Sequence, residues 1–198
     1  MTTRGRPRSA EAHAAILEAA LALLVEEGYR GFSMERVAER AGVGKATIYR
    51  RFASKDELLK EAIASLSADF EYVDTGSLAS DWLATVASGT AHPAIQKIPQ
   101  LLGDLMAQPE LHRIFSEHLV EPRRAVGRKM LERAQERGEI RKDADLEVAI
   151  DLLVGSLIYR LLRTGGDPRG VAALAPAALE TLVDGLKGPK PRSRARSR

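Results

Sequence analysis

The sequence predicts an all-α fold, in which a three-helix N-terminal helix-turn-helix domain precedes a larger helical domain. Apolar residues recur at the helical period along most of the chain, and no segment alternates as a convincing strand would. Hydrophobic residues are 44% of the 198 residues but aromatic residues only 5%, a composition that favours helices over sheets. Residues 33–52 form two short amphipathic segments joined by an Ala-Gly-Val-Gly turn, which is the layout of a helix-turn-helix.

The first helix is expected to begin at Ser9, a plausible N-cap, and to end at Gly28, a natural C-cap. Ile16 and Leu23 belong to its apolar face. A basic arm of Arg4, Arg6 and Arg8 precedes this helix. Such an arm can enter a DNA minor groove, although an inert solubilising terminus explains it equally well.

The second helix is expected to start after Ser33, which is a favoured N-cap residue. Gly42 can adopt the left-handed conformation that ends this helix. Ile48 anchors the third helix to the core and leaves its other face outward. The outward residues are Lys45, Thr47, Tyr49 and Arg50.

The fourth helix begins with a capping box in which Ser54 is the N-cap and Glu57 the reciprocal acceptor. Its apolar pattern continues to about Phe70, and the stretch 74–77 breaks it. We expect a DNA-binding domain at residues 1–55, a ligand-binding and dimerisation domain at 56–187, and a disordered basic tail at 188–198.

The larger domain reads as helix throughout. Its expected helices cover residues 78–91, 95–106, 111–137, 145–162 and 171–186. Pro122 is expected to kink or split the third of these. Charge is uneven along the chain: residues 1–60 carry 11 Lys and Arg against eight Asp and Glu, residues 61–186 carry 13 against 19, and residues 187–198 carry six against none. A polyanion should therefore meet the ends of the chain rather than its middle.

The N-terminal 60 residues resemble the DNA-binding domain of the tetracycline-repressor (TetR) family of bacterial regulators. The resemblance is carried by the helix from Ile16 to Gly28, by GFSMERVAERAGVGKATIYRRF and by the following SKDELL. The segment RGEIRKDADLEVAIDLLVGSLIYRLL also resembles one branch of TetR C-terminal domains. The resemblance implies a homodimer whose last two long helices pair across the interface, and an all-α C-terminal domain with a ligand pocket.

The candidate DNA-binding residues follow from this layout. Lys45 and Thr47, at the start of the third helix, suit base edges, because Lys can donate to guanine and the Thr methyl can meet thymine. Ser33 can hold a phosphate at a helix N-terminus. Tyr49 and Arg50 can reach phosphates or bases, and the resemblance implies that Tyr49 and Lys55 grip the backbone. The alternative is a solvated charged face.

Two further sets of candidates belong to the larger domain. A ligand pocket is implied by the resemblance, and its candidate lining residues are Phe70, Trp82, Leu101, Leu105, Met106, Phe115, Ile158 and Leu162. Because these are almost all apolar, we expect a largely apolar small-molecule effector, although ordinary core packing explains each residue singly. The dimer-interface candidates are Leu146, Leu152, Leu153, Gly155, Ser156, Tyr159, Leu179, Leu182 and Val183. Burial within one subunit is the alternative for these.

Other classes of function find little support. The chain has no cysteine, no apolar leader and no apolar run of about 20 residues, so we expect a cytoplasmic protein without disulfides or membrane spans. The sequence GVGKAT lacks the spacing of a phosphate-binding loop, and His112 and His118 fit no common metal pattern. We expect no catalytic residues, no cofactor and no metal.

The sequence thus predicts a ligand-responsive transcriptional regulator, most often a repressor in such proteins, that binds double-stranded operator DNA as a dimer. Two recognition helices in successive major grooves require a pseudo-palindromic operator with half-sites about 34–36 Å apart, or a multiple of that. Two alternatives remain: a constitutive DNA-binding protein with no effector, and a helical enzyme or small-molecule carrier with a borrowed N-terminus.

Overall fold

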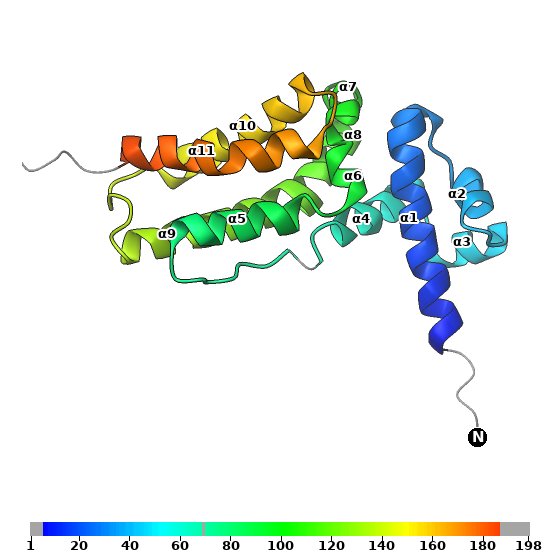
Figure 1. Ribbon diagram of the computed structural model, residues 1–198. Helices are drawn as coiled ribbons and strands as arrows, with labels where there is room; N and C mark the ends of the chain where they lie inside the picture. Colours follow the sequence, from blue (N-terminus) through cyan, green and yellow to red (C-terminus); the bar gives the residue numbers. More distant parts are fainter. Residues whose placement is uncertain (1–5, 69, 187–198) are drawn as a thin grey trace, which may run out of the picture.

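The computed structural model describes residues 6–68 and 70–186, and every regular element in these ranges is helical (Figure 1). The N-terminal part contains α1 (Arg6–Gly31), α2 (Met34–Arg40), α3 (Lys45–Arg51) and α4 (Lys55–Ser65). The elements that follow are α5 (Leu78–Gly89), α6 (Pro93–Gln96), η1 (Ile98–Leu101), α7 (Leu102–Ala107), α8 (Pro109–Phe115), η2 (Ser116–Val120), α9 (Glu121–Glu136), α10 (Leu146–Arg163) and α11 (Pro168–Leu186). The tail at 188–198 and Arg4 lie outside the described residues.

Helix α1 begins earlier than the sequence indicates. Ser9 is not its N-cap, because the helical backbone already starts at Arg6. Arg6 and Arg8 are therefore part of α1, and the expectation that they precede the first helix is wrong. Gly28 does interrupt α1, with φ 68° and ψ 177°, a backbone conformation that is almost confined to glycine.

The break at Gly28 is fixed by a residue from far along the chain. The backbone N–H of Tyr29 donates to Oδ2 of Asp104 in α7 at 2.7 Å. A Cβ atom added at Gly28 would lie 2.4 Å from the same oxygen. The local bend and a contact between the two parts of the molecule thus depend on one glycine.

Substituting Gly28→Ala should lower the free energy of unfolding by about 1–3 kcal/mol, the cost of forcing a Cβ into this backbone region. The displaced Asp104 side chain adds to that cost. Urea unfolding followed by circular dichroism measures it. Gly103→Ala is the matched control, since a Cβ there meets nothing within 4 Å and alanine favours helix. Equal stability of Gly28→Ala and the control would contradict the argument.

The helix-turn-helix forms as its sequence predicts. The Ser33 hydroxyl accepts the N–H of Arg36 at 3.3 Å, so Ser33 is the N-cap of α2. Gly42 has φ 66°, and the next amide, that of Val43, closes the turn on the Ala38 carbonyl at 2.9 Å. Ile48 is fully buried and fixes α3 against the other helices.

Helix α4 starts as expected and ends early. The N–H of Glu57 donates to Ser54 Oγ at 3.2 Å, and the Glu57 carboxylate accepts the N–H of Ala53 rather than that of Ser54. The helix ends at Ser65, so the expectation that it continues to Phe70 is wrong. A turn follows, in which the Leu66 carbonyl accepts from the guanidinium of Arg123 instead of from a helical amide.

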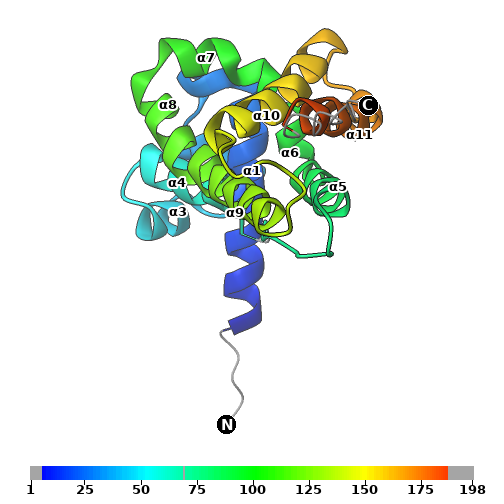
Figure 2. The ribbon, with the colours of Figure 1, turned by 90° about the vertical axis from the view of Figure 1, so that its left-hand side faces the viewer.

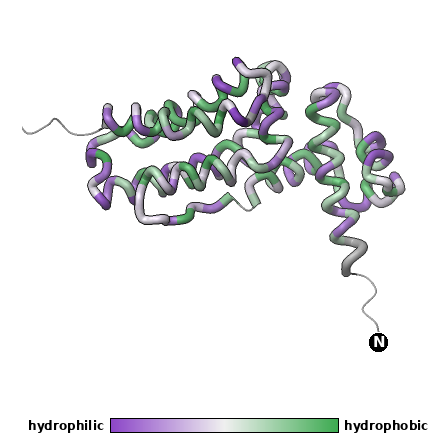
Figure 3. The backbone as a smooth tube through the Cα atoms, in the orientation of Figure 1, coloured by the Kyte–Doolittle hydropathy of each residue, from purple (hydrophilic) through white to green (hydrophobic). Residues whose placement is uncertain are grey.

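Two separate hydrophobic cores hold the molecule together. The first joins α1–α4 to Ile95, Leu101, Leu105, Leu111 and Ile114, so it contains residues on both sides of position 55. The second lies among α5, α9, α10 and α11 (Figure 1), along which hydrophobic residues recur in Figure 3. In Figure 2, α5 and α11 are seen nearly end-on, and α10 runs obliquely beside α11.

Some helices of the larger part are divided differently from the expectation. The segment expected at 95–106 is broken into α6, η1 and α7, with prolines at the start of the first two. The segment expected at 111–137 passes through a π-helical turn, η2, directly before Pro122. Proline has no N–H to donate, and a widened turn absorbs the lost bond.

Candidate DNA-binding surface and ligand cavity

The face of α3 that the sequence singles out is open to solvent. Lys45 and Arg50 are exposed, Tyr49 is 50% exposed and Thr47 is half-buried. In Figure 1, α2 and α3 lie at the outer edge of the molecule, on the side away from α10 and α11. Lys45, Tyr49 and Arg50 are therefore accessible on this face of α3, where a DNA groove could reach them.

Tyr49 is held against the neighbouring helix. Its hydroxyl donates to Oε1 of Glu35 in α2 at 2.5 Å. This hydrogen bond raises the pKa of Tyr49 and lowers the pKa of Glu35. The ring is therefore positioned before any contact with DNA, and its hydroxyl oxygen keeps acceptor capacity only, unless a ligand displaces Glu35.

Lys55 and Ser33 have structural partners as well. The ammonium of Lys55 lies 3.8 Å from the centre of the Tyr29 ring. Burial raises the pKa of Tyr29 to about 12, and its hydroxyl donates to Asp56 at 2.9 Å. The Ser33 hydroxyl caps α2. Both residues lie near the recognition helix, but a phosphate contact from either must coexist with these interactions.

Both basic residues of α2 form ion pairs with glutamates of α1. Arg36 forms an ion pair with Glu27, and Arg40 forms one with Glu26. The hydrogen bond from Arg40 lowers the pKa of Glu26. These pairs fasten α2 to α1 and leave positive charge concentrated on α3.

A cavity of about 490 Å³ lies mainly along the second hydrophobic core and reaches Ile95 and Leu119 of the first. Most of its walls come from α5, α9 and α10, with contributions from α6, η2, α11 and the segment after α4. Three of the expected residues, Phe70, Trp82 and Ile158, line it. The other five do not. Leu101 and Leu105 are buried in the first core, Phe115 packs against that core, Met106 is 89% exposed and Leu162 is 47% exposed.

Three charged residues of this cavity escaped the sequence analysis, namely Arg123, Arg124 and Asp151. Arg123 of α9 donates to the carbonyls of Leu66 and Gly89, both at 2.8 Å, and to Ser67 Oγ at 3.3 Å. Its guanidinium stacks 4.5 Å from the centre of the Phe70 ring. Burial lowers the pKa of Arg123 to about 10, which leaves it charged at neutral pH. Its only signal in the sequence is its place directly after Pro122.

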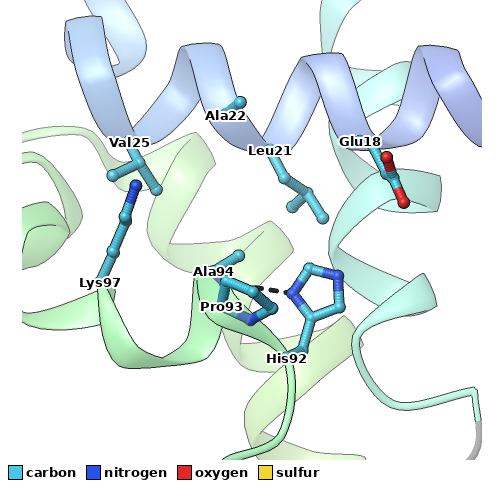
Figure 4. Close-up of a pocket in the computed structure, with 8 residues that line it drawn as sticks. All are labelled: Glu18, Leu21, Ala22, Val25, His92, Pro93, Ala94 and Lys97. Carbon is cyan, nitrogen blue, oxygen red and sulfur yellow. Dashed lines mark hydrogen bonds between the residues drawn. The ribbon is translucent and has the colours of Figure 1, made fainter. Parts of the chain in front are cut away.

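A second cavity of about 260 Å³ separates α1 from α6 (Figure 4). Glu18, Leu21 and Val25 of α1 face His92 and Lys97 across it. The Nδ1 atom of His92 accepts the N–H of Ala94 at 3.1 Å, which caps α6. This cavity thus lies beside the contact between α1 of the DNA-binding part and α6 of the C-terminal part.

The outer side of α10 is unusually apolar. Val148, Leu152 and Tyr159 are 52%, 57% and 66% exposed, and they recur at helical spacing. Of the expected interface residues, Gly155 is also exposed, whereas Leu153 and Leu179 are buried in the second core, because they face the other helices of the same chain. Leu146, Ser156, Leu182 and Val183 are half-buried.

None of the helices within residues 6–68 and 70–186 has the length and apolar character that crossing a membrane requires. In the same residues, no three His, Cys, Asp or Glu side chains come together as metal ligands would.

Comparisons with known proteins agree with this geometry. Residues 16–62 match the model for bacterial regulatory proteins of the tetR family, and residues 72–186 match that for the tetracyclin repressor-like C-terminal domain. The chain is 36% identical over 169 residues to the HTH-type transcriptional regulator YdeS of Bacillus subtilis, which covers 83% of this chain and 85% of the relative.

Two further relatives span almost the whole chain. It is 37% identical over 191 residues to the DNA-binding transcriptional repressor TetR of Mycobacteroides abscessus, covering 93% and 94% of the two chains. The crystal structure of the TetR family transcription regulator SCO0332 has a TM-score of 0.64 and 30% identity, over 90% of this chain and 100% of that one. The chain therefore belongs to the TetR family of helix-turn-helix transcriptional regulators, and it is a DNA-binding protein rather than an enzyme.

Proposed function

We propose that this protein is a ligand-responsive repressor that binds a pseudo-palindromic operator as a homodimer in the cytoplasm. The observation that carries the proposal is the exposed face of α3, where Lys45, Thr47, Tyr49 and Arg50 project from a buried anchor at Ile48. A relative covering 93% of the chain is named a repressor, which supports the direction of regulation.

Dimerisation is supported by the apolar stripe on α10. Exposed apolar side chains that recur along one helix face are typical of an interface. A homodimer with twofold symmetry presents two copies of α3, and two-half-site operators mirror that symmetry. Leu152, Gly155 and Tyr159 are the central residues of the proposed contact, with Ser156 and the half-buried Leu146, Leu182 and Val183 at its margin.

The effector site is proposed in the 490 Å³ cavity, whose size is that of an ordinary small-molecule pocket. Phe70 and Arg123 both line this cavity. Arg123 donates a hydrogen bond to the Leu66 carbonyl, in the turn that follows α4. Helix α4 packs on α1 of the DNA-binding part. A ligand that favours one position of α4 thereby changes the distance between the two recognition helices, which is differential binding to two states.

Titration of the protein with its own upstream DNA, repeated over a range of salt concentrations, tests the proposal. A repressor should bind one site about 10³–10⁷-fold more tightly than random DNA. A small ratio with a steep salt dependence would instead identify a non-specific architectural binder. Absence of binding at low salt would sink the proposal.

Two kinds of substitution in the recognition helix should have different effects. Lys45→Ala or Thr47→Ala should cost about 1–3 kcal/mol and relax the preference at one base pair. Tyr49→Ala should weaken binding to every sequence alike, because on DNA a phosphate replaces Glu35 as the acceptor of its hydroxyl, and a phosphate contact does not depend on sequence. A library of single-base operator variants separates the two outcomes.

The matched control for these substitutions is Lys142→Ala, which removes one exposed positive charge from the loop after α9. It should leave operator affinity unchanged, because that loop lies at the opposite end of the molecule from α3 (Figure 1). Uniform weakening by Lys45→Ala across all operator variants would place Lys45 on phosphate rather than on a base.

A further inference from the structure

The 490 Å³ cavity has almost entirely apolar walls. Trp82 and Val86 of α5, Met130 of α9, and Leu153 and Leu157 of α10 supply much of its surface. Both threonines of the lining use their hydroxyl protons within their own helix: Thr85 donates to the Asp81 carbonyl and Thr90 to the Val86 carbonyl. A ligand therefore meets few uncommitted donors in this space.

The charges in the lining are balanced with one exception. Arg124 donates to Glu147 and Asp151, so its charge is matched by two carboxylates. Within residues 6–68 and 70–186, Arg123 bonds only neutral oxygens, namely two backbone carbonyls and one hydroxyl. Among the described residues, no carboxylate thus pairs with this guanidinium, which lines an apolar cavity, where a charge interacts more strongly than in water.

The surroundings of Arg123 hold its guanidinium in one place. The Phe70 ring lies beneath it, and Gly89 lets both approach the end of α5. A Cβ atom at Gly89 would be 2.9 Å from Phe70 Cε2 and 3.3 Å from Arg123 Nη1. A guanidinium has five N–H donors. The three hydrogen bonds use one on each nitrogen, which leaves one on Nη1 and one on Nη2.

We propose that this cavity binds an apolar molecule bearing one anionic oxygen group, such as a carboxylate, and that Arg123 recognises that group. The apolar walls accommodate the body of such a ligand, and the guanidinium keeps one N–H on each terminal nitrogen for donation to a carboxylate. The expected effector is thereby narrowed from a largely apolar molecule to an amphipathic anion.

Arg123 also connects the proposed ligand with the DNA-binding part through the turn after α4. This part of the proposal rests on the proposed function. Arg123 bonds Leu66 and Ser67 in the turn directly after α4. An anion that draws the guanidinium toward the cavity competes with these neutral acceptors, because charged acceptors are preferred. The end of α4 would then lose its tie to α9 and become free to move.

The emission of Trp82 provides the test, because it is the only tryptophan in the sequence and it lines the cavity. The full chain is titrated with decanoate and with decanamide, which has the same shape without the charge. We expect decanoate to bind about tenfold more tightly or better, as hydrogen bonds to a charged group imply. Arg123→Gln should abolish this preference, and Arg123→Lys, which keeps the charge, should retain part of it.

Arg133→Gln is the matched control, since Arg133 lies on the same helix, is exposed and pairs with Glu136. It should behave as the unaltered protein does. Equal binding of the two probes by the unaltered protein would overturn the proposal even if Arg123→Gln failed to fold. So would a Trp82 signal that neither probe changes, or a preference that survives in folded Arg123→Gln.

This assay contains no DNA, so it fails independently of the proposed function. A protein that prefers decanoate through Arg123, yet binds no specific operator, would keep the anion site and lose the repressor role. A protein that binds its operator and ignores both probes would keep the repressor role and lose the anion site.

Discussion

Replacing Arg137 with methionine should lower the free energy of unfolding by about 3–5 kcal/mol, because it leaves a buried carboxylate without a cation. Asp81 of α5 is fully buried, and Arg137 Nη2 lies 2.9 Å from its Oδ2. The same guanidinium bonds Asp74 and Glu139, which ties the linker before α5 to the end of α9. Urea unfolding followed by circular dichroism measures the loss.

The dependence of this effect on pH identifies its cause. Burial raises the pKa of Asp81, but hydrogen bonds from Thr75, Arg137 and Tyr72 outweigh that, and the pKa lies below its ordinary value of 3.8. A lowered pKa in the folded state contributes stability above pH 3.8, which is lost as the pH falls through the lower value. Without Arg137 burial dominates, and a protonated Asp81 is tolerated. The stability gap between the two proteins should therefore narrow below about pH 4.

Two further variants test the assignment to Asp81. In Arg137→Met, the added change Asp81→Asn should recover part of the lost stability, since the amide oxygen can still accept from Thr75 without a buried charge. Arg133→Met removes an exposed pair with Glu136 on the same helix and should cost at most about 1 kcal/mol. Equal losses from Arg133→Met and Arg137→Met would show that Asp81 is irrelevant.

Features that depend on neighbouring residues could be predicted from the sequence. Ser33 and Gly42 delimit α2 through contacts within a few residues, and the capping residues of α4 act over the same range. The end of α4 could not be predicted, because Phe70 continues the apolar pattern. Arg123, 57 residues after Leu66, donates to the Leu66 carbonyl in the turn where the helix ends. A long-range hydrogen bond of this kind leaves no local pattern.

The candidate functional residues also fall into those that the sequence could predict and those that it could not. Exposure of Lys45, Tyr49 and Arg50 follows from the single buried anchor at Ile48. The residues that line the cavity could not be predicted in this way. Periodicity identifies the apolar face of a helix, but it does not show which of the two hydrophobic cores that face packs against. Leu105 thus joins the first core, although its pattern equals that of residues beside the cavity. Arg123 is one of several arginines near Pro122, and only the packing of α4 and α5 distinguishes it.

The apolar stripe on α10 carries the second large expected effect. Leu152 and Tyr159 are more than half exposed and contact no core of their own chain. In a protein that uses them as a dimer interface, the double change Leu152→Asp and Tyr159→Asp places like charges from both subunits against each other. The folded chain should remain intact, because neither side chain is buried within it.

Light scattering of the eluting protein should then give the mass of one chain rather than two. A monomer reaches one half-site at a time, so operator affinity should fall about 10²–10⁴-fold, the advantage that linked binding provides. Affinity for an isolated half-site should not change. Val73→Asp is the control, since Val73 is 59% exposed in the linker before α5 and lies off α10. If the double variant remains dimeric, the two recognition helices are held together by another surface, and the role assigned to α10 is wrong.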